Sequence, residues 1–381
     1  MGFFLVVSIL NFAIETHPLA TFRMIIPEIR LSRIRLPLIT PYRLSYRTVE
    51  AFEPLLIEVR DGEGNSGWGE GHISPGSSSE TPAGGWAYCR DIAAAAAGRD
   101  SGAIKASVLE SMAQSPVAAS AFLCAIDMLC GDPLLQPPAG EMRLALLTPV
   151  NGLTSEAIAA EIEDKLADGF TTFKIKVGTD LEGDIARVRA IQDAVCGRAT
   201  MRIDANQAYS QDQARRFVNA LDPEGVELFE QPCAADDWDA NAAIAALSPV
   251  PVMLDEPICA IADIERAAAI KGVGLCKLKL KRFGTLSRLK RALKLTRDLG
   301  MTPVLGDGLG TELSCWMEAC VARTTIDNAG EFNGFLKPKI RLFAEPLVFA
   351  RGHVVLRPDF VPRINRDILA RHTMMEQHFA A

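Results

Sequence analysis

Three acidic residues each stand at the end of a predicted strand. Asp204 closes MRID, Glu230 closes VELFE and Asp255 closes VMLD, at nearly equal spacing. Three carboxylates within a few ångströms of one another repel unless a cation neutralises them. Oxygen ligands alone suit a hard cation, and Mg²⁺ keeps open positions for substrate oxygens. We therefore predict a site for Mg²⁺, with Mn²⁺ as the alternative ion. The purely structural interpretation is that these acids only form ion pairs with nearby lysines.

Lysine residues stand on both sides of these acids. Lys174 and Lys176 are two positions apart on one predicted strand, so both point to the same side of it. Their mutual repulsion and a nearby divalent cation lower the pKa of a lysine and make the neutral amine available as a base. Lys279 comes three strand–helix units later, roughly across the mouth. Bases on opposite faces of one carbon suit racemisation or epimerisation, whereas solvated lysines at strand ends are the alternative.

Other polar residues follow the same strands. They are Asn206, Glu256, Lys281 and Asp307. A single charged residue after a strand is usually just solvated, but six consecutive strands that end in polar residues are hard to explain in that way. We therefore expect these groups to converge at one place.

The scaffold that would bring them together is a barrel of parallel strands. The predicted strands are Leu144–Val150, Thr172–Val177, Met201–Asp204, Val226–Glu230, Val252–Asp255, Leu275–Leu280 and Thr302–Leu305. Amphipathic helices are predicted between them, for example Ser155–Ala167, Gln211–Leu221 and Leu286–Leu299. This alternation indicates a parallel sheet with crossover helices. So many consecutive units favour a closed barrel, in which active sites lie at the C-terminal ends of the strands.

A separate region precedes the barrel. Residues 24–140 read as strands and then helices, with antiparallel strands at Ile26–Leu38 and Pro54–Arg60 and helices at Trp86–Ala97 and Val117–Leu129. The Gly/Ser/Pro-rich stretch Gly71–Gly85 predicts a mobile lid loop. We predict a capping domain at 24–140 that is completed by the tail, about 340–381, and a barrel domain at 141–339.

Bulk composition excludes several classes of protein. The chain has 381 residues with 49% hydrophobic and 23% charged residues, as expected for two packed globular domains. A net charge of −7 argues against a nucleic-acid partner, which needs a basic face. The apolar run Phe3–Ile14 is too short to cross a membrane, so residues 1–23 are interpreted as an N-terminal extension. Nine cysteines without a zinc-like spacing predict free, buried thiols in a reducing cytosol.

Taken in order, the motifs closely resemble those of the enolase superfamily. The matching segments are KIKVG at 174–178, DANQAY at 204–209, EQP at 230–232, DEP at 255–257 and KLKRFG at 279–284, where Thr285 replaces the usual final glycine. Within that superfamily the chain resembles the mandelate racemase/muconate-lactonizing-enzyme family, and specifically its muconate-lactonizing-enzyme-like subgroup. The mandelate-racemase-like branch needs a His–Asp dyad on the later strands, and no histidine lies in the predicted barrel.

The resemblance implies a fold, a cofactor and roles for individual residues. The implied fold is α/β, a modified (β/α)7β TIM-type barrel with an α+β capping domain. Asp204, Glu230 and Asp255 would be the metal ligands, with Asn206 and Glu256 orienting the site. Lys176 would be one base, tuned by Lys174, and Lys279 the opposite base. Glu312 would lie near the carboxylate of a small substrate, in a cytoplasmic homo-oligomer.

A further set of residues bears on the identity of the substrate. Dipeptide epimerases of the subgroup carry Asp-x-Asp near the last strand, and here the stretch is Glu331-Phe332-Asn333. Asp307 either faces a cationic nitrogen or caps the helix that begins near Thr311. Arg43 and Arg47 could meet a second substrate carboxylate or could simply be exposed. We expect a racemase or epimerase of an amino-acid-derived carboxylate. The alternatives are a cycloisomerase, a dehydratase of the hydroxyproline or o-succinylbenzoate type, and a catalytically silent binding protein.

Overall fold

The computed structural model describes residues 24–43, 48–75 and 79–381. The predicted N-terminal extension, Arg47 and part of the predicted lid lie outside these ranges. Within them, no helix combines the length and the apolar character needed to cross a membrane.

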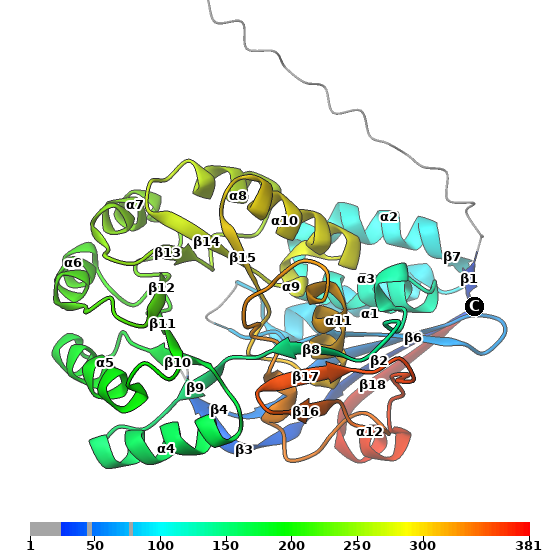
Figure 1. The fold of residues 1–381 in the computed structure, drawn as a ribbon. Coiled ribbons are helices and arrows are strands. Elements are labelled where there is room, and N and C mark those ends of the chain that lie inside the picture. Colours follow the sequence, from blue (N-terminus) through cyan, green and yellow to red (C-terminus); the bar gives the residue numbers. More distant parts are fainter. Residues whose placement is uncertain (1–23, 44–47, 76–78) are drawn as a thin grey trace, which may run out of the picture.

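The main sheet consists of seven parallel strands in the order β15-β14-β13-β12-β11-β10-β9. They are β9 (Thr148–Val150), β10 (Thr172–Lys176), β11 (Thr200–Asp204), β12 (Val226–Glu230), β13 (Val252–Leu254), β14 (Val273–Leu278) and β15 (Thr302–Leu305). Figure 1 shows the sheet curling inside a ring of helices. These helices are α4 (Ser155–Ala167), α5 (Leu181–Val195), α6 (Gln211–Ala220), α7 (Trp238–Leu247), α8 (Ile261–Ala268), α10 (Leu286–Asp298) and α11 (Glu312–Ala322). The predicted α/β barrel is therefore confirmed.

The gap between β15 and β9 is closed by a short irregular segment. The amide of Gly330 donates to Ala145 O at 2.9 Å, and its carbonyl accepts from Leu147 N at 3.0 Å. The next amide, of Glu331, donates to Leu305 O of β15 at 2.9 Å. Gly330 thus bonds to the chain just before β9, and Glu331 bonds to β15. The Glu331 side chain therefore lies with the polar groups at the strand ends.

Some predicted strands differ from the observed ones. Leu144–Val150 is divided into β8 (Met142–Ala145) and β9, and β8 pairs with β17 (His353–Leu356) outside the barrel. β14 ends before Leu280 because Lys279 is the cap residue of a short helix, α9 (Leu280–Phe283). Lys281 therefore lies on a helix rather than at the end of a strand.

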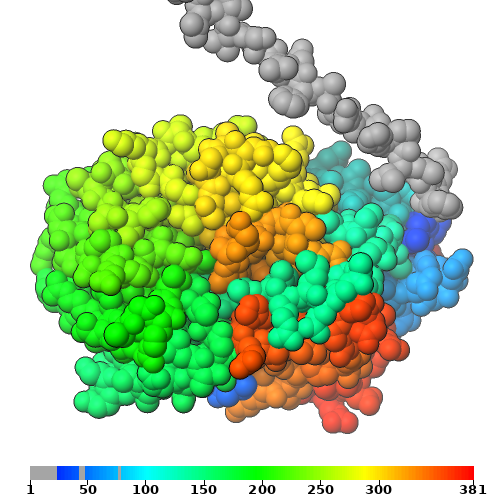
Figure 2. Space-filling model, in the orientation of Figure 1, coloured from blue at the N-terminus to red at the C-terminus, as the bar shows by residue number. Residues whose placement is uncertain are grey.

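An antiparallel sheet lies beside the barrel, with the strand order β18-β2-β5-β6. Its strands are β2 (Glu28–Ile34), β5 (Leu55–Arg60), β6 (Ser66–Gly71) and β18 (Thr373–Ala380). The smaller elements of this region are β1 (Ile25–Ile26), β3 (Leu36–Arg43), β4 (Thr48–Phe52), β7 (Arg99–Asp100), β16 (Val348–Ala350), α1 (Pro82–Ala96), α2 (Ser101–Ser111), α3 (Pro116–Leu129), α12 (Arg366–His372) and the 3-10 turns η1 (Met112–Gln114), η2 (Pro133–Leu135) and η3 (Gly334–Leu336). The predicted strand Ile26–Leu38 is thus three strands. Figure 2 shows the red tail packed beside the blue-green segment that leads into the barrel. The domain boundaries stay predictions.

The predicted lid has different bounds in the structure. Gly71 ends β6, and Pro82 already begins α1, where Thr81 Oγ1 accepts from Gly84 N at 3.0 Å. The connection between the two elements is therefore shorter than Gly71–Gly85. The mobility of this connection stays a prediction.

Alternating glycines on β6 let helix α3 lie directly on the strand. A Cβ atom on Gly69 would stand 1.8 Å from Ala121 O, and one on Gly67 would stand 2.1 Å from Ala125 O. Real Cβ atoms do not approach backbone oxygens so closely, so any larger residue would push α3 away. Helix α3 also packs against α9, which directly follows Lys279. The contact between α3 and β6 therefore supports the end of β14, where Lys279 stands.

We predict that Gly69→Ala destabilises the protein by about 3 kcal/mol, the upper part of the usual cost of overpacking. The measurement is the urea midpoint of unfolding. The matched control is Gly62→Ala, since a Cβ on Gly62 would meet nothing within 4 Å. Equal midpoints for the two variants would show that the close approach of α3 is unimportant.

Two acids of the smaller region cap helices of the barrel. Glu70 on β6 accepts from Thr311 N at 2.7 Å and from Ser314 N at 3.0 Å, at the start of α11. Asp127 on α3 accepts from Leu286 N at 3.2 Å, at the start of α10. These bonds satisfy amides that a helix leaves unpaired at its N-terminus, and they join the smaller region to the barrel.

All nine cysteines are free thiols. Cys130, Cys196 and Cys259 are exposed, so the expectation that all of the thiols are buried is wrong. Cys196 is an example: it is the C-terminal cap residue of α5, and its left-handed backbone (φ 48°) ends that helix at the surface.

Candidate active site

The predicted metal ligands lie at the same level of neighbouring strands. Lys176 is the register partner of Asp204, and Asp204 is the register partner of Glu230. Asp255 directly follows β13. All three acids are at most 2% exposed. The strand ends thus gather these acids in the interior, as the sequence predicts for the C-terminal face of a barrel.

Two ammonium groups stand among the first two acids. Lys174 Nζ is 2.9 Å from Asp204 Oδ2 and 2.8 Å from Glu230 Oε2. Lys176 Nζ is 2.5 Å from the same Asp204 oxygen and donates to Asn206 Oδ1 at 2.7 Å. The side chains of Lys174 and Lys176 therefore point to one side of β10, as their spacing predicts.

The opposite side of the acid row has its own cations. Lys279 Nζ donates to Asp255 Oδ2 at 2.8 Å, and Arg282 Nη1 donates to Asp255 Oδ1 at 2.9 Å. Arg282 was not among the predicted site residues. Its signal in the sequence is its place in the KLKRFG motif, three residues after Lys279. Buried lysines thus flank the acids from β10 on one side and from the end of β14 on the other. We call the three acids and the lysines Lys174, Lys176 and Lys279 the strand-end cluster.

Burial and neighbouring charges shift the pKa values of these lysines and acids in opposite directions. Burial lowers the pKa of Lys176, but Asp204 raises it, and the net pKa lies above the usual value. The same balance, with Asp255 as the acid, raises the pKa of Lys279. Burial would raise the pKa of Asp204, but Lys174 and Lys176 hold it well below its usual range. In this state the lysines are protonated and the aspartates ionised.

Asn206 and Glu256 connect the two halves of the cluster. Asn206 Nδ2 donates to Glu256 Oε1 at 3.3 Å, while its Oδ1 accepts from Lys176. Burial, together with Asp255 and Asp204, raises the pKa of Glu256 to about 7. The structure therefore places both residues beside the acids and the lysine, as the sequence predicts.

Lys281 and Asp307 form an ion pair with each other. Asp307 Oδ1 accepts from Leu309 N at 3.3 Å. The cap of α11 is Thr311 itself, whose hydroxyl accepts from Leu313 N, so the interpretation of Asp307 as that cap is wrong. Asp307 thus faces the Lys281 ammonium in the structure, and its contact with a cationic substrate stays a prediction.

Glu331 is neutralised by lysines as well. Lys174 Nζ lies 2.9 Å from both of its oxygens, and Lys277 donates to Oε2. Asn333 accepts from Lys337 Nζ at 2.8 Å and donates to Leu147 O at 2.8 Å. Sequence reasoning missed Lys277 and Lys337. The only signal for Lys277 is its alternation with Lys279 along one strand, which turns both side chains inward.

The remaining predicted residues lie elsewhere. Glu312 accepts from Phe343 N at 2.8 Å and from Leu347 N at 2.9 Å, and so holds the tail rather than facing the lysines. Arg43 ends β3, which pairs with β4 there; its side chain, like all of Arg47, is outside the described part of the chain. Glu312 is therefore not among the residues gathered at the strand ends, and the roles of Arg43 and Arg47 stay predictions.

The donor set suits a hard divalent cation. Among the described residues, neither oxygen of Glu230 accepts a well-oriented hydrogen bond, although Lys174 Nζ is 2.8 Å from one of them. Buried carboxylate oxygens without such bonds are expected where a cation binds. Within the same described ranges, no group of acids, cysteines or histidines is already arranged around one point. The three acids therefore suit a divalent cation in their ligand type and in their position at the strand ends. The ammonium groups of Lys174 and Lys176 lie next to Asp204.

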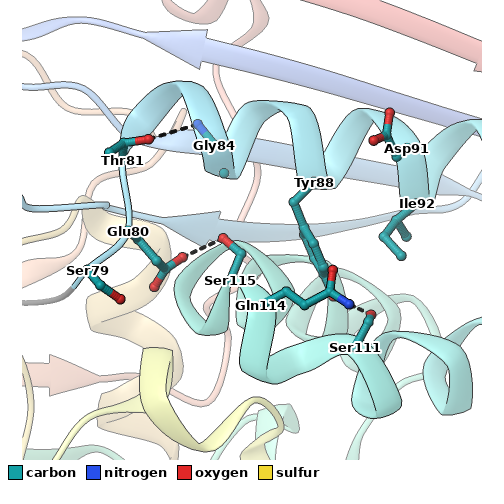
Figure 3. A pocket seen from close by; sticks show the side chains of 11 residues that line it. Ser79, Glu80, Thr81, Gly84, Tyr88, Asp91, Ile92, Ser111, Gln114 and Ser115 are labelled. Carbon is teal, nitrogen blue, oxygen red and sulfur yellow. Dashed lines mark hydrogen bonds between the residues drawn. The ribbon is translucent and has the colours of Figure 1, made fainter.

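We also considered two cavities as candidate sites, one next to Lys281 and Asp307 and one elsewhere. A space of only about 20 Å³ adjoins Lys281 and Asp307, roughly the size of one water molecule. A cavity of about 440 Å³ lies between α1 and the segment from the end of α2 to Ser115 (Figure 3). There Glu80 accepts from Ser115 Oγ at 2.5 Å, and Tyr88 bonds to Ser111. The second cavity contains none of the strand-end residues and is not part of the site.

Comparison with known proteins places the chain in a family. Residues 157–359 match the family model described as enolase C-terminal domain-like, and the chain belongs to this family. It is an enolase-superfamily enzyme of the isomerase or lyase type, so the predicted superfamily is confirmed.

Several relatives match over most of the chain. The L-Lys-D/L-Arg epimerase of Methylococcus capsulatus is 28% identical over 332 residues, which cover 81% of this chain and 91% of the relative. The o-succinylbenzoate synthase of Geobacillus stearothermophilus is 27% identical over 367 residues, covering 92% and 95%. Among solved structures, the dipeptide epimerase of Cytophaga hutchinsonii, complexed with Mg and D-Ala-L-Val, has a TM-score of 0.84. It is 22% identical and covers 93% of this chain and 100% of its own.

Proposed function

We propose that this chain racemises or epimerises an amino-acid-derived carboxylate by moving the proton on the carbon next to the carboxylate. One observation carries the proposal. Buried lysines flank the acid row from both sides, Lys176 at Asp204 and Lys279 at Asp255. A base on each side is what a reaction needs when it takes a proton from one face and returns it to the other.

In the proposed reaction, Lys176 removes the proton from one face of the α-carbon. The electron pair of the broken C–H bond moves into the carboxylate and gives an enediolate. Lys279, as an ammonium, then donates a proton to the opposite face. For the other enantiomer the two lysines exchange roles. Asn206, which accepts from Lys176 at 2.7 Å, holds that amine in place.

Asp204, Glu230 and Asp255 are the residues that would hold the cation, and we propose Mg²⁺ as that ion. When bound, a divalent cation neutralises the acids that now raise the pKa of the lysines and supplies positive charge beside the substrate carboxylate. The Mg²⁺ complex of the Cytophaga hutchinsonii dipeptide epimerase supports this choice. A cytoplasmic homo-oligomer remains part of the proposal and rests on the family resemblance alone.

A second candidate is one-sided chemistry. The o-succinylbenzoate synthase of Geobacillus stearothermophilus matches 92% of this chain, and the muconate cycloisomerase 1 of Acinetobacter baylyi is 27% identical over 293 residues. In a cycloisomerase or dehydratase, one lysine acts as base or acid and its counterpart only stabilises negative charge. Such an enzyme exchanges the proton from a single face.

The experiment that tests the proposal is proton exchange in deuterated water. A panel of dipeptides, N-acyl amino acids and muconates is incubated with enzyme and Mg²⁺, and loss of the α-proton is followed by NMR. We expect exchange with both enantiomers of at least one amino-acid derivative, and loss of exchange when a strong chelator is added. Exchange of a single enantiomer favours one-sided chemistry, and no exchange with any amino-acid derivative would contradict the proposed racemisation.

A further inference from the structure

The C-terminal strand β18 forms an outer edge of the antiparallel sheet. Among the described strands it pairs with β2 alone, at one end of the order β18-β2-β5-β6. In Figure 1 it runs along the rim of the molecule, from α12 to the C-terminus. Its five residues from Met374 to His378 are all exposed. Within the described part of the chain, one long side of β18 is therefore open to solvent.

The register shows which backbone groups of β18 face this open side. Ala381 N donates to Pro27 O at 3.0 Å, and the same register continues along the ladder between the two strands. The hydrogen bonds of an antiparallel strand alternate in direction from one residue to the next. The backbone groups of the odd-numbered residues therefore face β2. Those of Glu376, His378 and Ala380 point away from it and offer donors and acceptors to another strand.

The strand lacks most of the features that protect a sheet edge. Protected edge strands are usually short, or they carry lysine or proline. β18 has eight residues, TMMEQHFA, and contains neither lysine nor proline. Its one irregularity is the register shift between Thr373 and Met375, at its beginning. The remainder of β18 is thus a regular edge on which a further strand can form hydrogen bonds.

The side chains of β18 are complementary to an antiparallel copy of the same strand. A twofold axis at Gln377 places Glu376 of each copy opposite His378 of the other, in a pair whose backbones bond to each other. It also places Met375 opposite Phe379. An acid–imidazole pair and a sulfur–aromatic contact therefore each occur twice. The side chains of Glu376 and His378 are 49% and 46% exposed, so both are open to a second copy.

Charged residues of β2 hold the ends of these two side chains. His378 Nε2 is 2.6 Å from Glu28 Oε1, and Glu376 Oε1 is 3.7 Å from Arg30 Nε. The imidazole has a second nitrogen and the carboxylate has a second oxygen. Each group can therefore keep its contact within its own chain and bind the other copy at the same time.

We propose that two copies of this chain associate through β18, antiparallel about a twofold axis at Gln377, so that their four-stranded sheets join into one. The inference goes beyond the proposed function, which concerns the barrel. A second copy fits this edge because one sequence supplies both members of every complementary pair, as a twofold contact requires. One pair of strands is a small contact beside the ~1,600 Å² of a standard interface. We therefore expect a dissociation constant in the micromolar range.

Sedimentation velocity of the full chain at ~1 to ~100 µM, the range over which such a dimer dissociates, is the first test. We expect the wild type to dimerise. His378→Glu places two acids opposite each other and should weaken the dimer at least tenfold, and Glu376→Lys should weaken it as well. An equimolar mixture of the two variants should associate again, because each acid of one variant then faces a basic residue of the other. Glu110→Lys, at an exposed position on α2, is the control.

A disulfide tests the register of the two strands independently. Gln377→Cys should link two copies under mild oxidation, since directly opposite residues of a pair without mutual backbone bonds have Cα atoms ~4.5 Å apart. Met375→Cys, at another exposed position of the strand, should not, because its two copies are four residues apart along the strands, about 13 Å. Mass spectrometry identifies the bond, because three native thiols are also exposed.

The unfolding temperature of each variant shows whether it is folded. A wild type that stays monomeric at ~100 µM, or that associates equally well in every folded variant, would overturn the proposal. Association that appears only after residues 1–23 are deleted would assign this edge to the chain's own N-terminal segment and would overturn it too. A disulfide in Met375→Cys but not in Gln377→Cys would show that the proposed register is wrong.

Discussion

Lys176→Ala stops proton exchange with one enantiomer of the substrate, and Lys279→Ala stops it with the other. The reason is geometric. Lys176 extends from β10 to Asp204, and Lys279 extends from the end of β14 to Asp255, so they approach the acid row from opposite sides. Removing a positioned base costs about 10²- to 10⁴-fold in rate. Both variants should therefore lose net racemisation, since a full turnover needs both faces.

Exchange of each enantiomer, followed separately by NMR in deuterated water, is the measurement. Lys294→Ala is the control, because the side chain of that lysine is 72% exposed and pairs with Asp298. If either variant at position 176 or 279 racemises at the wild-type rate, the two-base mechanism is wrong. Exchange of one enantiomer alone in the wild type would instead assign the enzyme to cycloisomerisation or dehydration.

Glu230→Gln should abolish activity and weaken Mg²⁺ binding at least tenfold while leaving the metal-free protein folded. Glu230 is fully buried, yet neither of its oxygens has a well-oriented hydrogen bond among the described residues. The amide removes a charged cation ligand. Its ion-pair partner Lys174 still has Asp204 and Glu331. Asp204→Asn and Asp255→Asn should also abolish activity, but each leaves buried cations without a partner, which costs about 3 to 5 kcal/mol.

Calorimetric titration with Mg²⁺ and thermal unfolding without metal separate these two effects. Glu182→Gln, at a position 70% exposed, serves as the control. We expect the unfolding temperature of the metal-free protein to fall more for Asp204→Asn than for Glu230→Gln. Full activity of the wild type in strong chelator, or unchanged Mg²⁺ affinity in Glu230→Gln, would contradict the assignment of these ligands.

Strand ends were the most predictable part of the site. Val226–Glu230, Thr302–Leu305 and the helix Ser155–Ala167 have the same bounds in the sequence-based prediction and in the structure. Their hydrophobic periodicity and flanking residues define them locally. Since parallel strands end on one face of a barrel, the placement of Asp204 and Glu230 together follows from the strand assignments alone.

What could not be predicted depends on contacts between distant segments. The turn from Lys279 into α9 is stabilised by Arg282 at Asp255, across a separate strand. A lysine such as Lys277 normally indicates solvent, and only the barrel register turns it to Glu331. Lys337 comes after β15, the last strand of the barrel, in a segment without regular periodicity. Glu312 was placed by analogy, but its bonds to the tail amides depend on how the chain returns.

The order of strands in the smaller sheet has a consequence for synthesis on the ribosome. β2 pairs with β5 on one edge and with the C-terminal strand β18 on the other. At ~5–20 residues per second, translation leaves β2 without its outer neighbour for roughly twenty seconds to a minute. During that time Ile29 and Leu31, fully buried in the finished protein, lie on an open strand edge. Such edges recruit other strands, so we expect the nascent chain to be most prone to association before β18 emerges.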